Sequence, residues 1–198
     1  MAYYVELSQA PRYHPTIVFE DQPPPGLFRF DYLKDGERAS PDEVPQHVRV
    51  TSTHKRVSDV FAIKWYWGVR QNFKDLVERL EPGLHQFFQV ELRYRTGAVE
   101  EGALFIFNIC RSMDGLLFDE SDLSWSSTGR PIMYPFPGMI VRGKPLGLLV
   151  HDKAAIAGCH VWRGDRLGSP YVFFSEALYD EFVREKLKKL VAYRTLEK

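Results

Sequence analysis

Hydrophobic residues recur with helical spacing near the middle of the chain. Four apolar side chains occupy positions i, i+3, i+4 and i+7, one face of a helix: Phe73, Leu76, Val77 and Leu80. Pro82 and Gly83 follow them and are expected to end the helix. Trp65, Tyr66 and Trp67 precede it, and the pattern leaves open whether they close a strand or open the helix.

The same kind of spacing predicts a second helix near the C-terminus. Ser175 is a favourable N-cap, and acidic residues follow it where the helix dipole is positive. The predicted inward stripe comprises Tyr179, Phe182, Val183, Leu187 and Leu190. Basic side chains are expected to complement the negative end of the dipole: Lys186, Lys188 and Lys189.

The remaining apolar segments have the patterns of β-strands. Short or alternating apolar runs predict strands over residues 3–7, 16–20, 28–32 and 146–150. Segments 86–95 and 104–110 are separated by a turn at Thr96 and Gly97, and we expect them to form a hairpin. Because segment 104–110 is apolar almost throughout, it is expected to be covered on both faces. Charge, proline and glycine predict a loop over residues 34–47.

Together these elements predict an α+β fold, with about two main helices packed on a mixed or antiparallel sheet. The length of 198 residues favours a single domain, residues 1–198, with a β-rich N-terminal region over residues 1–65. Whether that region forms a separate subdomain is left open by the pattern.

Charge is balanced over the whole chain, with 26 basic and 26 acidic residues. This balance argues against a whole-protein electrostatic grip on nucleic acid or an anionic membrane, and the 44% hydrophobic fraction excludes global disorder. Locally the signs separate into an acidic stretch (Asp114, Asp119, Glu120 and Asp122) and a basic stretch from Arg184 onward. The acidic stretch is either a solvated loop or a plug for a basic site on a partner, and the basic stretch is either a helix end or a phosphate contact.

The first residues lack the basic and apolar regions of a secretory signal, and no segment approaches the roughly 18 apolar residues of a membrane-spanning helix. Cys110 and Cys159 lie in apolar sequence contexts, where free buried thiols are usual. We therefore expect a cytoplasmic protein with reduced cysteines and no membrane partner.

Common catalytic and cofactor motifs are absent from the sequence. It contains no phosphate-binding loop, dinucleotide fingerprint, nucleophile elbow, paired-cysteine motif or HExxH zinc motif, so no catalytic residue, metal or cofactor is expected. An unrecognised enzyme site using His151, Asp152 and Asp165 is one alternative, although adjacent strand residues such as His151 and Asp152 point to opposite faces. A regulatory protein-binding module is the other.

The densest cluster of polar and aromatic residues is His160–Asp165. In a strand, His160 and Trp162 share one face, while Arg163 points to the other. If Arg163 pairs with Asp165 across the turn at Gly164, the segment holds the fold. If Trp162 and Arg163 are instead exposed, they are typical binding anchors.

This cluster and its surroundings resemble bacterial immunity protein family eleven, which is also catalogued as a domain of unknown function. The resemblance rests on the run AGCHVWRGD (residues 157–165), on PYVFFS (170–175) with its acidic helix start, on residues 80–88, on residues 107–109 and on Ser121. It covers roughly residues 70–195, within a family-like core over residues 66–198. Family members commonly carry Asp or Asn where Gly164 stands here.

The resemblance implies a cytoplasmic protein that binds a cognate antibacterial toxin or effector and neutralises it by occlusion, without catalysis and without direct nucleic-acid contact. It implies a structural role for the motif residues His160, Trp162, Arg163 and Asp165. For partner binding we select, by residue type, the exposed members of an aromatic set (Tyr3, Tyr4, Trp65, Trp67 and Trp125) and three acidic residues (Asp119, Glu120 and Asp122). The toxin's chemistry and the oligomeric state are not specified by the sequence.

Overall fold

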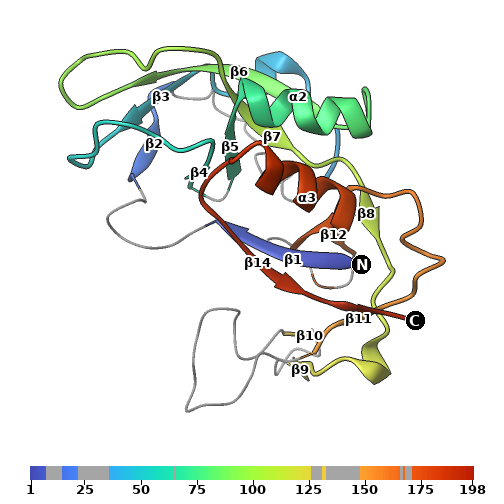
Figure 1. The fold of residues 1–198 in the computed structure, drawn as a ribbon. Helices are drawn as coiled ribbons and strands as arrows, with labels where there is room; N and C mark the ends of the chain where they lie inside the picture. The colour runs from blue at the N-terminus through green and yellow to red at the C-terminus, as the bar shows by residue number, and fades with distance from the viewer. Residues whose placement is uncertain are drawn as a thin grey trace.

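Two main β-sheets and two α-helices form the described part of the chain (Figure 1). The computed structural model describes residues 1–7, 15–21, 36–64, 66–125, 131–132, 148–165, 167 and 171–198. Helices α2 (Gln71–Leu80) and α3 (Glu176–Arg184) lie against each other. The predicted α+β class with two main helices is therefore confirmed.

The first sheet has five strands in the order β14-β1-β13-β12-β8. Their bounds are Leu190–Arg194 (β14), Ala2–Leu7 (β1), Val172–Ser175 (β13), Val161–Gly164 (β12) and Ser112–Met113 (β8). All neighbours are antiparallel except β12 and β8, which are parallel. The N-terminal strand β1 is thus held between two strands from the C-terminal part of the chain, and the two chain ends lie close together (Figure 1).

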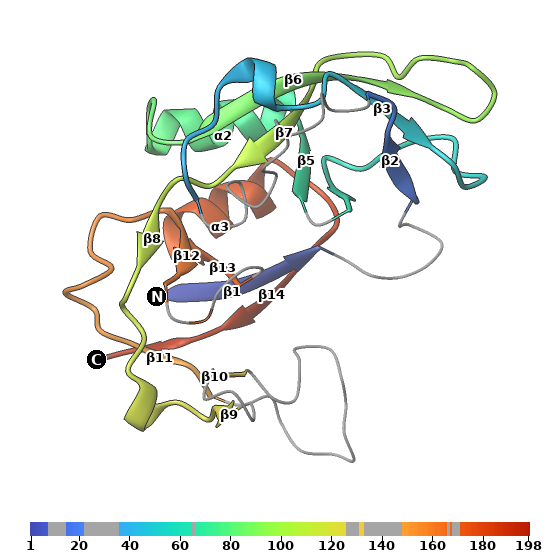
Figure 2. The same cartoon turned by 180° about the vertical axis from the view of Figure 1, so that it is seen from behind.

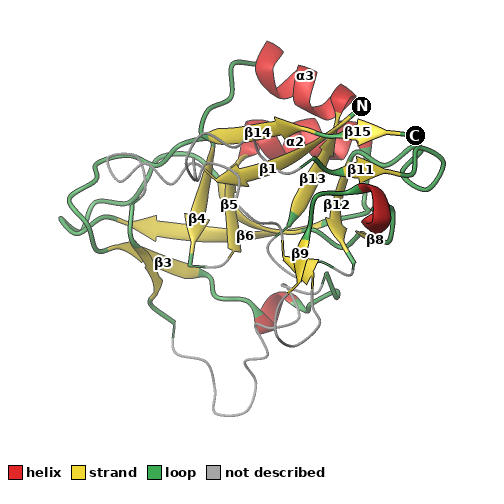
Figure 3. Cartoon of the chain, turned by 90° about the horizontal axis from the view of Figure 1, so that it is seen from below, coloured by secondary structure: helices red, strands yellow, loops and turns green. Residues whose placement is uncertain are grey.

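The second sheet has six strands in the order β2-β3-β6-β7-β5-β4. Their bounds are Ile17–Phe19 (β2), His47–Val50 (β3), Gln86–Arg93 (β6), Leu104–Asn108 (β7), Tyr66–Arg70 (β5) and Val60–Ile63 (β4). The sheet curls so that β4 and β5 run across the direction of β3 and β6 (Figure 3), and its two edge strands β2 and β4 touch. The predicted hairpin is confirmed as the antiparallel pair β6–β7.

Shorter elements complete the described chain. Two strand pairs are β9 (Ser124–Trp125) with β10 (Pro131–Ile132), and β11 (Val150–His151) with β15 (Leu196–Glu197). Two 3-10 helices are η2 (Pro41–Glu43) and η3 (Phe118–Glu120).

The described residues contain three hydrophobic clusters, and the alternation of side chains along each strand explains which residues belong to which cluster. In β7, Phe105 and Phe107 face a cluster shared with both helices and the five-stranded sheet, whereas Leu104 and Ile106 face the inside of the curled six-stranded sheet. The third cluster covers the opposite face of the five-stranded sheet. Figure 2 shows the helices α2 and α3 between β6–β7 and β1–β14.

Helix α3 ends earlier than its apolar spacing predicts. Ser175 is the N-cap, as expected, and its hydroxyl accepts from the Leu178 amide. However, Lys186 adopts a left-handed conformation (φ 57°), and the Leu187 amide donates back to the Phe182 carbonyl, as in a Schellman C-cap. Leu187 is therefore buried, but it lies beyond the end of the helix. Val183 lies within the helix but is 55% exposed, so its predicted place in the inward stripe is wrong.

Other sequence expectations differ in detail. Strands β3 and β4 were not predicted, and β3 begins at His47, the last residue of the predicted loop. Tyr66 and Trp67 belong to strand β5, which answers the question left open before α2. The strand expected at 146–150 starts at Val150, and the one at 28–32 lies outside the described residues. Cys110 and Cys159 are both free, the first half-buried and the second buried.

One close approach in the six-stranded sheet gives a stability prediction. Gly68 lies opposite Phe61, whose ring covers it, and a Cβ at this position would lie 2.3 Å from Phe61 Cε2. Because Phe61 is buried, Gly68→Ala is expected to cost about 1–3 kcal/mol of unfolding free energy in urea titration. In a Phe61→Leu background the same Gly68→Ala substitution should cost less unfolding free energy than it does in the wild type. An equal cost in the two backgrounds would contradict the steric explanation.

Candidate functional site

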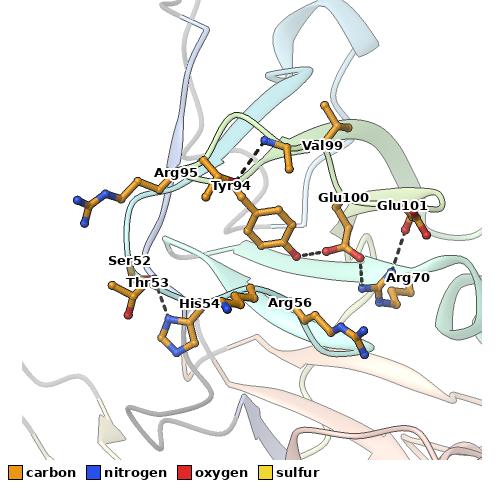
Figure 4. Close-up of a pocket in the computed structure, with 13 residues that line it drawn as sticks. Ser52, Thr53, His54, Arg56, Arg70, Tyr94, Arg95, Val99, Glu100 and Glu101 are labelled. Atoms are coloured by element: carbon orange, nitrogen blue, oxygen red, sulfur yellow. Dashed lines mark hydrogen bonds and ion pairs between the residues drawn. The ribbon is translucent and has the colours of Figure 1, made fainter.

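A cleft of about 890 Å³ opens at one end of the six-stranded sheet (Figure 4). It lies between the loop of residues 52–56, which follows β3, and the turn of residues 94–101, which joins β6 to β7. Because β3 and β6 are parallel neighbours, their C-terminal ends carry these two segments to the same end of the sheet. Arg70, the last residue of β5, lies opposite Leu104 and reaches the cleft from the third side.

The guanidinium of Arg70 is fixed by the walls of the cleft. Its Nη2 lies 2.7 Å from Glu100 Oε1 and donates to the Val57 carbonyl at 3.1 Å, and Nη1 donates to the Glu101 carbonyl at 3.3 Å. The Tyr94 hydroxyl donates to the other carboxylate oxygen of Glu100. Tyr94, Glu100 and Arg70 therefore form a connected, largely shielded wall (Figure 4).

The two lips of the cleft carry cations of a different kind. Lys55 and Arg56 on one lip and Arg95 on the other are exposed, and within the described chain their side chains have no hydrogen-bond or ion-pair partner. Val99 lines the cleft as well and is 49% exposed, and Glu101 adds an exposed carboxylate. The cleft thus combines free positive charge with an apolar contact, a composition suited to binding an anionic protein surface.

A buried charged junction occupies a different place, where α2 ends. Glu81 Oε1 lies 2.6 Å from Arg111 Nη1 and accepts from the His160 amide, and Glu81 Oε2 lies 2.7 Å from His85 Nε2 and accepts from the Val161 amide. Because the Cys110 amide donates to His85 Nδ1, the ring proton lies on Nε2, facing Glu81. The junction joins α2 to β12 and to the segment after β7.

The pKa of Glu81 is lowered by the donors that surround its carboxylate. Burial raises the pKa of the carboxyl, but the hydrogen bonds from His85 and from the His160 amide and the charge of Arg111 outweigh it, so the pKa lies below its usual 4.5. Glu81 is therefore held as a carboxylate that accepts four hydrogen bonds.

A model of one protein family matches nearly the whole chain, over residues 6–195, and its description is the immunity protein family Imm11. The chain belongs to the Imm11 family. No curated protein matches the chain. Within the part of this Imm11 protein that the structure describes, no helix is long and apolar enough to cross a membrane, and no group of three or more His, Cys, Asp or Glu side chains is placed to hold a metal ion.

The motif residues of the Imm11 chain lie in β12 and the turn after it. Trp162 is 1% exposed and stacks on Phe173, and His160 Nδ1 lies 2.9 Å from the Ser175 hydroxyl. Arg163 Nε donates to the Ile109 carbonyl at 3.0 Å, and Asp165 accepts from the Ser112 hydroxyl. These contacts tie the strand to its neighbours, and a structural role for the motif remains our proposal.

The described residues of the aromatic set selected for partner binding differ in exposure. Tyr4 (3% exposed) and Trp67 (8%) are buried, because β1 and β5 are internal strands with apolar clusters on both faces. Tyr3 is half-buried, with its ring centroid 4.3 Å from that of Tyr179 on α3. Trp65 lies outside the described residues, and Trp125 belongs to β9. Tyr4 and Trp67 are therefore not accessible to a partner in this conformation.

Asp119 and Glu120 lie in η3 and Asp122 follows it, on the opposite side of the molecule from the turn that joins β6 to β7 (Figure 1). Asp119, Glu120 and Asp122 are all exposed. Glu120 pairs with Lys198, and Asp122 accepts from the Leu148 amide at 3.0 Å. The acidic stretch and the end of the basic stretch are thus neighbours in space and partly neutralise each other.

His151, Asp152 and Asp165, the residues of the alternative enzyme hypothesis, each make separate local contacts. His151 is 1% exposed and packs against the rings of Phe173 and Trp162. Asp152 accepts from the Ala154 and Ala155 amides, and Asp165 from Ser112. We find no arrangement among these three residues in which their polar groups converge on one described cavity.

Sequence reasoning missed the cleft. Its cations are spread over the loop 52–56 and the turn 94–101, and neither segment has periodicity or a motif. Only the parallel pairing of β3 with β6 brings them together. The one available signal was the basic character of residues 54–56 and 93–95 beside turn residues.

Proposed function

We propose that this protein is a cytoplasmic immunity protein that binds a cognate antibacterial toxin and neutralises it by occlusion, without catalysing a reaction. The observation that carries the proposal is the match of the Imm11 family model to residues 6–195. Occlusion needs only a stable complex, and a typical stable protein interface buries roughly 1,600 Å² in total.

Two exposed regions offer charge for such an interface: the basic lips of the cleft and the acidic residues at η3. Interfaces of this kind draw specificity and rapid association from complementary charge, with a few central residues supplying most of the affinity. Neutral net charge is compatible with this mechanism, because the basic lips of the cleft and the acidic residues at η3 belong to different segments of the chain.

Co-expression tests the proposal. A toxin encoded beside this chain should arrest growth when expressed alone, and co-expression of this chain should restore growth and yield a co-purifying complex. An Imm11 chain from an unrelated locus is the matched control and should not rescue. Growth arrest that persists with this chain present, together with an absence of complex, would contradict the proposal.

A further inference from the structure

We propose that the cleft between residues 52–56 and 94–101 receives an acidic segment of the toxin, with Arg56 and Arg95 each binding a carboxylate and Val99 contacting an apolar side chain of the same segment. This inference rests on the proposed function and identifies the surface that performs it. Three observations support it.

The first observation is how the arginines are used. Among the arginines that the structure describes, Arg56 and Arg95 are the ones whose side chains contact no partner, and both line this cleft. The others are engaged: Arg38, Arg49, Arg70, Arg79, Arg93, Arg111, Arg163, Arg184 and Arg194. A guanidinium presents a planar fork of donors that fits a carboxylate in bidentate geometry, so two free guanidiniums, one on each lip of the cleft, are suited to two separate acidic side chains.

The second observation is the rigid wall behind these lips. Arg70 is held by Glu100 and by two backbone carbonyls, and Tyr94 holds the other oxygen of Glu100. The turn itself is closed by bonds between Tyr94 and Ala98 and between Gly97 and Tyr94. A lip held in this way loses little conformational freedom on binding, which favours affinity.

The third observation is that the cleft is lined by basic, acidic and apolar side chains together. Glu100 is paired with Arg70, but Glu101 also lines the cleft as an exposed carboxylate and would repel the continuous phosphate charge of a nucleic acid. A protein segment can instead place separate carboxylates against Arg56 and Arg95 and leave Glu101 to a basic or polar group. Val99 also lines the cleft, is 49% exposed and offers an apolar contact of the kind found at interface centres. The occupant that fits is therefore an acidic protein segment.

A groove of about 580 Å³ continues from the cleft along β6 and shares Val99 and Glu100 with it. It is lined by both apolar and polar residues, among them Phe87, Gln89 and Val44. A segment bound at the arginines can therefore extend across Val99 and continue along the sheet.

The test uses the full chain and a catalytically inactivated form of the toxin encoded beside it. In the variant Arg56→Glu/Arg95→Glu, both free guanidiniums become carboxylates. We expect its Kd for the toxin to rise by about 100-fold or more, because like charges then face each other across the interface. The control Lys153→Glu/Lys188→Glu makes the same change in net charge at exposed lysines outside the cleft, and its Kd should stay within about threefold of the wild type.

Several outcomes distinguish this inference from the proposed function. If the wild type does not bind the toxin, the proposed function fails. If the wild type binds and both double variants bind equally well, the toxin uses another surface and the inference is overturned. Because the exchanged side chains are exposed, the variants are expected to fold, which circular dichroism checks; if the glutamate variant does not fold, Arg56→Gln/Arg95→Gln replaces it. Binding of a DNA or RNA oligonucleotide that the glutamate variant abolishes, without loss of toxin binding, would also overturn the inference.

Discussion

Glu81→Gln is expected to lower the free energy of unfolding by about 3–5 kcal/mol, the cost of breaking a buried ionic group from one side. The carboxylate accepts from His85, Arg111 and the amides of His160 and Val161, and Glu81 is 5% exposed. An amide has one oxygen, so two of these donors would face the NH₂ group of Gln. Chemical denaturation followed by Trp fluorescence measures the loss.

A matched control lies within helix α2, which Glu81 follows as the C-cap. Asp75→Asn makes the same chemical change at an exposed carboxylate whose side-chain contact is with Gln71, one turn earlier. This variant is expected to stay within about 0.5 kcal/mol of the wild type. Equal stability of the two variants would mean that the junction does not hold α2 to β12.

Acid should act on the same group. The pKa of Glu81 is lower in the folded chain than its ordinary 4.5, so folding favours the carboxylate. The stabilisation is therefore fully present above about pH 4.5 and is lost as the pH falls through the lower folded pKa. In Glu81→Gln this part of the acid dependence should be missing.

The two helices show which parts of the fold can be predicted from the sequence. The α2 stripe was predicted correctly because all of its apolar positions face one cluster, so periodicity and packing agree. The predicted α3 stripe is too long, because Leu187 is an apolar core residue that lies after the left-handed residue Lys186, where the helix has already ended. Apolar spacing indicates which side chains are buried, and buried side chains can continue past the C-cap, so the spacing alone does not locate the end of a helix.

Long-range contacts account for what could not be predicted. Strands β3 and β4 are four residues each, and β3 is recognised through its pairing with β6, about forty residues away in sequence. The four donors to Glu81 come from three separate segments. The cleft likewise depends on two segments that β-pairing brings together. The motif His160–Asp165 was found because its residues are adjacent in the chain.

Acidification to pH 5 is expected to destabilise the protein through His151 in particular. The ring is 1% exposed, and neither ring nitrogen has a hydrogen-bond partner in the described chain. Burial lowers the pKa of His151 from 6.5 to about 4. The unfolded chain therefore takes up a proton between these two values while the folded chain does not.

The sign and size of the effect follow from this difference. The contribution of His151 is complete above pH 6.5 and declines as the pH falls toward 4, by about 1.4 kcal/mol per pH unit. Between pH 7 and pH 5 the wild type should lose about 2 kcal/mol through this group, measured as the change in unfolding free energy in urea. The loss adds to the acid dependence of Glu81, which begins at a lower pH.

His151→Leu separates this contribution from that of the other histidines. Leucine is close to histidine in volume and suits a site formed by Trp162 and Phe173, so the variant should fold and lose about 2 kcal/mol less than the wild type between pH 7 and pH 5. His54→Leu is the control, because His54 is only half-buried and contacts Ser52, and it should keep the wild-type dependence. If His151→Leu loses as much stability as the wild type over this interval, the ring is not held neutral by its burial. The position of His151 in β11, paired with the C-terminal strand β15, places the acid-sensitive group where the last residues of the chain join the fold.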